Sequence, residues 1–208
     1  METLARAADA IRAGELVVYP TETVYGLGAD ATNPDAVERV FDAKGRDRSK
    51  PISFAVPSVP AALEYVRATD RERQFMATFL PGPVTVLCRR RDAVPSALTA
   101  GRDRVGVRVP DHQLALMLLE RAGTPVTATS ANVSGRESAR TVDDLDPEIV
   151  ERAAVVVEDV DDLPALPRQP QLGEQAAVPE STVVDVSSDE IHRRGAMADE
   201  IERWLEEH

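Results

Sequence analysis

Apolar residues recur every three or four positions in several stretches of the chain, which predicts amphipathic helices. The clearest boundaries belong to the stretch 33–45. Asn33 can cap free backbone N–H groups, Pro34 suits a first turn, and Gly45 can end the helix in the left-handed conformation. Other helices are expected over 4–11, around Leu63 and Val66, over 75–80, after an opening Asp111, and as a terminal amphipathic helix over 196–207.

Short apolar runs bounded by Pro or Gly predict buried strands over 16–19, 52–56, 84–88, 105–109, 125–129, 155–157 and 182–186. Because these strands interleave with the helices, the pattern predicts an α/β domain with a twisted, partly parallel sheet. We expect one domain over 1–208. The Pro-rich stretch 161–180 is predicted to be a surface loop, which either closes over a site or is an inert excursion.

Composition narrows the class of protein. The chain has 208 residues, enough for a sizeable core, and its aromatic content of 4% predicts a mainly aliphatic one. A net charge of −12 weighs against non-specific binding of nucleic acid. It indicates either an ordinary acidic protein or one from an acidic proteome adapted to high salt. The only cysteine, Cys88, lies in an apolar run and is expected in the core. Without a long apolar stretch at the N-terminus, we expect a cytoplasmic protein with no membrane span.

Four cations follow the helix predicted over 33–45: Lys44, Arg46, Arg48 and Lys50. Arg offers a planar fork for phosphate or carboxylate, and Lys offers a point charge. In a chain with 36 acidic and 24 basic residues, this cluster indicates an anion-binding site. The alternative is a solvated basic turn in which Lys44 only favours the C-terminal end of the helix dipole.

Two polar segments also follow predicted strands. Ser130 and Asn132 come after the strand 125–129, and ligands of open α/β sheets bind at such strand ends. The run PTETVYGLG over 20–28 combines hydroxyls with glycines that permit close backbone approach. Each could instead be a simple turn or cap. No His, Cys and carboxylate cluster has the spacing of zinc ligands, so no metal site is predicted.

Taken together, these segments resemble the YrdC-like family of L-threonylcarbamoyladenylate synthases, in its short form. The resemblance covers nearly the whole chain in order: GELVVYPTETVYGLG at 14–28, FDAKGR at 41–46, KP at 50–51, PGPVT at 81–85, GVRVP at 106–110, TSANVSG at 129–135, STVVD at 181–185 and RRGA at 193–196. It implies a twisted open mixed sheet with helices packed on it and a concave ligand cleft. This collinearity favours a functional reading of each motif over the structural one.

The activity that the resemblance implies is nucleotidyl transfer. ATP, L-threonine and bicarbonate or CO2 would give threonylcarbamoyl-AMP and pyrophosphate, and a downstream threonylcarbamoyl transferase complex would modify N6 of adenosine 37 in tRNA. Mg²⁺ is expected with ATP, without a dedicated protein ligand. Binding of tRNA is expected to be weak or indirect.

Residue roles follow from matching motif positions. The Lys-x-Arg and Ser-x-Asn pairs imply catalytic roles for Lys44, Arg46, Ser130 and Asn132. The positions implied to bind ATP are Arg46, Lys50, Ser130, Ser138 and Arg193, and those implied to bind threonine are Thr23, Arg108 and Ser181.

Some features depart from the family pattern. Ala55 stands where many members have a His, which puts one threonine contact in doubt, and Arg194 replaces a frequent Pro. The extra C-terminal domain of the longer family branch is not in this sequence. Two other readings stay open: a sibling on the same fold with different chemistry, against which the intact Lys-x-Arg and Ser-x-Asn pairs argue, and an RNA-binding module, against which the net charge weighs.

Overall fold

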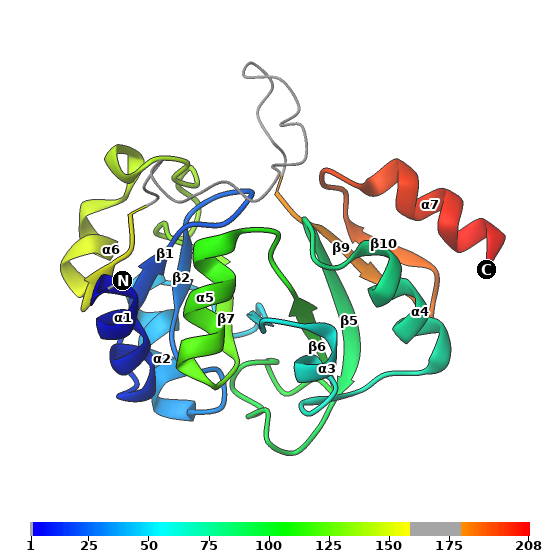
Figure 1. Cartoon of the computed structure of the whole chain (residues 1–208), viewed down its shortest axis with the longest axis horizontal. Helices are drawn as coiled ribbons and strands as arrows, with labels where there is room; N and C mark the ends of the chain where they lie inside the picture. The colour runs from blue at the N-terminus through cyan, green and yellow to red at the C-terminus, as the bar shows by residue number, and fades with distance from the viewer. Residues whose placement is uncertain (1, 159–179) are drawn as a thin grey trace.

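The structure is a computed structural model that describes residues 2–158 and 180–208 (Figure 1). The strands in these ranges form one mixed sheet in the order β10-β9-β5-β6-β3-β7-β2-β1-β8, with β4 added beside β5. They are β1 (Val17–Tyr19), β2 (Gly26–Gly28), β3 (Ser53–Ala55), β4 (Val66–Arg67), β5 (Val84–Arg90), β6 (Arg104–Arg108), β7 (Val126–Ser130), β8 (Val155–Val156), β9 (Thr182–Asp185) and β10 (Glu190–Arg193).

The sheet is partly parallel, as the interleaved pattern predicts. The pairs β1 with β8, β3 with β6 and β5 with β9 are parallel, and the other pairs are antiparallel. Strands far apart in sequence, such as β3 and β7, are therefore neighbours, and polar residues at their ends come together.

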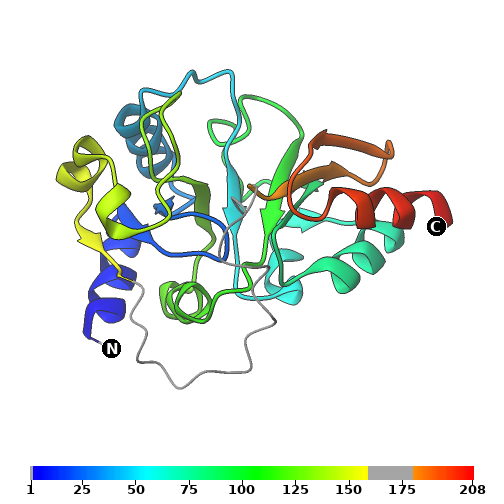
Figure 2. The same cartoon turned by 90° about the horizontal axis from the view of Figure 1, so that it is seen from above.

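Helices pack at both ends of the sheet. They are α1 (Glu2–Arg12), α2 (Pro34–Lys44), α3 (Val59–Ala62), α4 (Asp70–Phe79), α5 (Gln113–Ala122), α6 (Pro147–Arg152) and α7 (Ala198–Glu207), with a 3₁₀ turn at Val142–Asp144. Helix α1 lies beside α5, and the Arg12 side chain donates to the Arg121 carbonyl at 2.6 Å. At the other end, α7 packs on α4. The first and last helices thus lie at opposite ends of the molecule (Figures 1 and 2).

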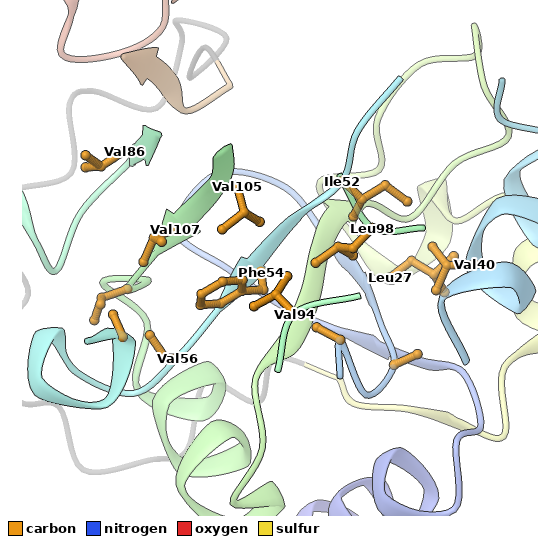
Figure 3. Close-up of a cluster of buried hydrophobic side chains, with 14 of the residues drawn as sticks. Leu27, Val40, Ile52, Phe54, Val56, Val86, Val94, Leu98, Val105 and Val107 are labelled. Carbon is orange, nitrogen blue, oxygen red and sulfur yellow. The ribbon is translucent and has the colours of Figure 1, made fainter. Parts of the chain in front are cut away.

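The core is mainly aliphatic. Phe54 of β3 lies among Val105, Val107 and other branched side chains, which fill the space beneath the central strands (Figure 3). Cys88 is fully buried in this core, and burial raises the pKa of its thiol well above the usual range, so the structure supports a packing role for it.

The predicted helix over 33–45 is confirmed as α2. The Asn33 side chain accepts from the backbone N–H groups of Asp35 and Ala36, and Gly45 has φ of 53°, the left-handed conformation that ends the helix. The helix predicted around Leu63 and Val66 is wrong. Helix α3 ends at Ala62, and Val66 belongs to β4, where pairing with β5 overrides the local spacing.

Other boundaries differ in smaller ways. The fifth helix is capped by His112, one residue after the Asp111 predicted to open it. Strands β2 and β10 and helix α6 were not predicted: β2 is Gly-Leu-Gly, and β10 carries Glu, His and Arg rather than an apolar run. Helix α7 occupies most of the predicted range 196–207. The predicted loop over 161–180 lies outside the described residues except for Glu180, and the one-domain reading stays a prediction.

Within the described ranges, no helix has both the length and the apolar character needed to cross a membrane.

Candidate ligand-binding cleft

A cavity of about 630 Å³ runs along one face of the sheet, lined by residues from every strand except β4 and β8. Six of the predicted site residues line it: Thr23, Arg46, Arg108, Ser130, Ser181 and Arg193. These residues are spread from position 23 to position 193. Arg108, Ser130 and Arg193 lie on β6, β7 and β10, and the other three lie in the segments between elements. The predicted ATP side and the predicted threonine side therefore share one hollow.

Lys44 and Asn132 do not line the cavity but lie behind the residues that do. The Lys44 side chain is 1% exposed. Its ammonium donates to the carbonyl oxygens of Ser130 and of Asn132, the latter at 2.7 Å. The Asn132 amide in turn donates to the carbonyls of Val133 and Arg136 at 2.9 and 2.8 Å. The two residues thus fix the turn that presents Ser130 to the cavity.

Two further predicted ATP residues, Lys50 and Ser138, lie at the margin. Lys50 is exposed, and its carbonyl accepts from the Arg46 guanidinium at 3.1 Å. Ser138 is half-buried in the segment after β7, and its hydroxyl donates at 3.3 Å to Glu180, which lines the cavity.

Arg108 anchors the predicted threonine corner. One of its guanidinium nitrogens, Nη2, donates to Glu22 Oε1 and to Thr23 Oγ1, both at 2.8 Å. The half-buried Glu22 carboxylate therefore orients Arg108, a role that was not predicted from sequence. Ala55 pairs with Arg108 across β3 and β6 and also lines the cavity. A small side chain there leaves open the space that a His would fill.

Ser181 lies between the predicted threonine corner and Arg193, one of the cations that line the cavity. Its hydroxyl lies 3.1 Å from Thr85 Oγ1 and accepts from Arg193 Nη2 at 2.8 Å. Arg193 Nε donates to the Ser181 carbonyl at 2.9 Å. Both motifs near the C-terminus, STVVD and RRGA, thus meet at one contact beside the cavity.

Burial and mutual repulsion shift the ionisation of the cations. The pKa of Lys44 falls to about 8, chiefly because burial disfavours its charged form and also because of Arg46. The pKa of Arg46 is lowered by burial and by Arg193, and burial also lowers that of Arg193. A bound anion would relieve this repulsion, so the electrostatics favour a ligand with several negative charges.

In the described part of the chain, no group of three or more His, Cys, Asp or Glu side chains is placed to hold a metal ion. Three carboxylates, of Asp103, Glu180 and Asp185, do line the cavity separately. Because Glu180 and Asp185 are paired with Arg193 and Arg104, these carboxylates form no dedicated metal site, and a Mg²⁺ ion here would take most of its ligands from phosphates and water.

Sequence reasoning missed seven cavity residues with charged, titratable or phenolic groups: Tyr19, Arg102, Asp103, Arg104, Glu180, Asp185 and His192. Arg104 donates to the buried Glu72 at 2.6 Å and pairs with Asp185 at 3.0 Å. Tyr19 and Glu180 each lie within or beside a quoted motif, so adjacency to a motif was the only available sequence signal for them.

The fold and the cleft define an α/β protein with a cation-lined, anion-binding cavity on an open mixed sheet. The family model Sua5_yciO_yrdC, described as "Telomere recombination", matches residues 9–195. The chain therefore belongs to the Sua5/YciO/YrdC family, which confirms the resemblance drawn from the motifs and the predicted fold class.

Several relatives carry the name threonylcarbamoyl-AMP synthase. The chain is 43% identical over 133 residues to the protein of that name from Pyrococcus abyssi, which covers 64% of this chain and 39% of that protein. It is 38% identical over 157 residues to the one from Bacillus subtilis, covering 74% and 45%.

Among solved structures, P. abyssi Sua5 complexed with L-threonine matches with a TM-score of 0.76 and 33% identity, over 92% of this chain and 54% of that one. The chain thus spans about half the length, or less, of these relatives.

Proposed function

We propose that the chain is an L-threonylcarbamoyl-AMP synthase: it joins ATP, L-threonine and bicarbonate or CO2 to give threonylcarbamoyl-AMP and pyrophosphate. The observation that carries this proposal is the shared cavity, which is lined by all three residues matched to threonine and by three of the five matched to ATP. The names of the relatives and the threonine complex of P. abyssi Sua5 support the same assignment.

In the proposed reaction, the charged cavity residues position the two substrates. Threonine would bind with its carboxylate at Arg108, beside Thr23 and Ser181. Its amine would form a carbamate with CO2, and a carbamate oxygen would attack the α-phosphorus of ATP. The bond from that phosphorus to the bridging oxygen breaks, and pyrophosphate leaves with the electron pair. Holding both reactants side by side in one cavity matters because a free carbamate is short-lived in water.

The cations would stabilise the charge that develops on the leaving pyrophosphate. Arg46 and Arg193 line the cavity and are the groups proposed to contact the phosphates. Lys44 would act from behind the Ser130 turn, by its charge and by fixing that turn. Ser130 is proposed to hold the nucleotide side.

Mg²⁺ is proposed to enter as its complex with ATP, with ligands from the phosphates and water, and to neutralise phosphate charge there. The proposed destination of the product is a threonylcarbamoyl transferase complex that modifies N6 of adenosine 37 in tRNA. The enzyme is proposed to be cytoplasmic and to contact tRNA weakly or only through that complex.

Pyrophosphate release tests the proposal. We expect release with ATP, L-threonine, bicarbonate and Mg²⁺ together, and expect omission of threonine to abolish it. Serine in place of threonine tests the amino-acid specificity, and mass spectrometry should detect threonylcarbamoyl-AMP. Pyrophosphate release that continues unchanged without threonine would refute the synthase assignment.

A further inference from the structure

Glu180 lies where the proposed function needs an anion. Its carboxylate accepts from Arg193 Nη1 at 2.5 Å and from the Ser138 hydroxyl at 3.3 Å. Both partners match ATP-binding positions of the family. The Glu180 side chain also lines the cavity.

The negative charge of Glu180 also reaches the other cations of the site. It partly offsets the lowering of the pKa of Lys44, of Arg46 and of Arg193. One carboxylate therefore serves as counter-ion to all three cations that are proposed to act on the phosphates.

The ion pair between Arg193 and Glu180 is weak enough for a ligand to displace it. The side chains of Arg193 and Glu180 are 45% and 43% exposed, and ion pairs this open to water are weak. The backbone of Gly195 packs closely on this segment, because a Cβ added at Gly195 would lie only 2.0 Å from the Glu180 carbonyl oxygen and 2.5 Å from Thr182 N. Rotation of the exposed Glu180 side chain is enough to release Arg193.

We propose that Glu180 is the resident counter-ion of the nucleotide site: its carboxylate holds the place of a phosphate group and has to leave Arg193 before a polyphosphate ligand can bind. This inference rests on the proposed ATP site. A ligand with one negative charge gains little by replacing a carboxylate, whereas a triphosphate brings several charges. Glu180 thus selects for polyphosphates, and its return favours departure of pyrophosphate.

Direct binding tests this role. We expect Glu180→Gln and Glu180→Ala to bind ATP and inorganic tripolyphosphate about threefold more tightly than the unchanged protein, because the exposed ion pair that the ligand has to replace is weak. Titration calorimetry in EDTA keeps metal ions out of the measurement. The matched control is Glu120→Gln, which removes the same charge from an exposed position on α5 and should leave both affinities unchanged.

Pyrophosphate gives a second readout. Its dissociation, followed by stopped-flow displacement, should slow by a similar factor in both Glu180 variants and not in Glu120→Gln. Unchanged or weaker polyphosphate binding in the Glu180 variants would overturn the inference, because a carboxylate that only orients Arg193 would weaken binding when lost. Failure of all proteins to bind tripolyphosphate would overturn it too. Tighter binding without threonine-dependent pyrophosphate release would instead uphold the counter-ion and refute the synthase.

Discussion

Lys44 is a charged side chain with almost no access to water. It is 1% exposed, and its ammonium satisfies two carbonyl oxygens in the turn that carries Ser130. Arg46, two residues later, lines the cavity and is only partly buried. The two cations of this short motif therefore have different roles: Lys44 mainly supports the turn at Ser130, and Arg46 faces the cavity.

Substitution should separate these roles. We expect Lys44→Ala and Arg46→Ala each to slow pyrophosphate release by about 100-fold or more through lost charge stabilisation. Lys44→Ala should also lower the free energy of unfolding, by about 2 kcal/mol, because two carbonyl groups lose their donor in the interior. Arg46→Ala should lower it less, because the Lys50 and Pro51 carbonyls that accept from Arg46 lie closer to solvent. Rates and urea unfolding curves of both variants check this. A Lys44→Ala protein as stable as the unchanged one would contradict the supporting role.

The ionisation of Lys44 predicts a pH dependence. With a pKa of about 8, this side chain is charged below that pH and neutral above it. We therefore expect kcat/KM for ATP, which reports the free enzyme, to fall as the pH rises through about 8. The bound triphosphate should raise this pKa, so kcat should fall only at higher pH.

The control for this prediction is Lys44→Arg, whose guanidinium stays charged throughout the range. Its rate can be lower at every pH, but the decline near pH 8 should be absent. A decline that persists unchanged in this variant would assign the ionisation to another group.

Sequence reasoning found the residues of the cleft that stand in recognisable motifs. Thr23, Arg108 and Ser181 were predicted together because their motifs occur in order along the chain. Glu22 and Glu180 were not, because a carboxylate acquires its role from the cations beside it, and those cations come from distant strands. Which cation faces the ligand and which lies behind it is equally a property of packing.

At the scale of elements, α7 shows what an amphipathic pattern can and cannot predict. Its apolar face, with Ile201 and Trp204, was expected from the spacing. The spacing did not predict which surface of the protein α7 covers. Trp204 meets the Phe75 ring edge-on, with 5.0 Å between ring centroids, and Arg71 lies 5.7 Å above its ring. A periodicity identifies the buried face of a helix but carries no information on its partner.

Loss of this contact should be costly. We expect Trp204→Ala to lower the free energy of unfolding by about 3 kcal/mol, because it removes a large buried ring and leaves a cavity beside α4. Thermal unfolding and urea titration measure this. Arg203→Ala, at an exposed position of the same helix, is the control and should change the stability by less than about 0.5 kcal/mol. Equal stability of the two variants would show that α7 does not depend on the ring.

For the molecule as a whole, the net charge of −12 contrasts with the cations gathered at the cavity. Carboxylates on the rest of the surface repel one another, and this repulsion destabilises the folded state at low ionic strength. The charge total was evident from the sequence. The distribution of the charged residues, with cations at the cavity and an excess of carboxylates elsewhere, depends on the fold.

We expect the melting temperature to rise by about 5 °C between 50 mM and 1 M KCl, because salt screens repulsion between exposed charges. Differential scanning calorimetry measures the change. A variant with Glu120→Lys and Glu151→Lys, both at exposed helical positions, should show a smaller rise because it starts with less repulsion. A melting temperature that falls with KCl would show that favourable surface ion pairs outweigh the net charge.

The lining of the cavity begins at Tyr19 on β1 and extends to Arg193 on β10. A ribosome therefore delivers Lys44 and Arg46 long before Ser181 and Arg193 exist. A ligand that needs the whole lining can therefore stabilise only the completed chain, and it cannot direct the folding of the emerging one.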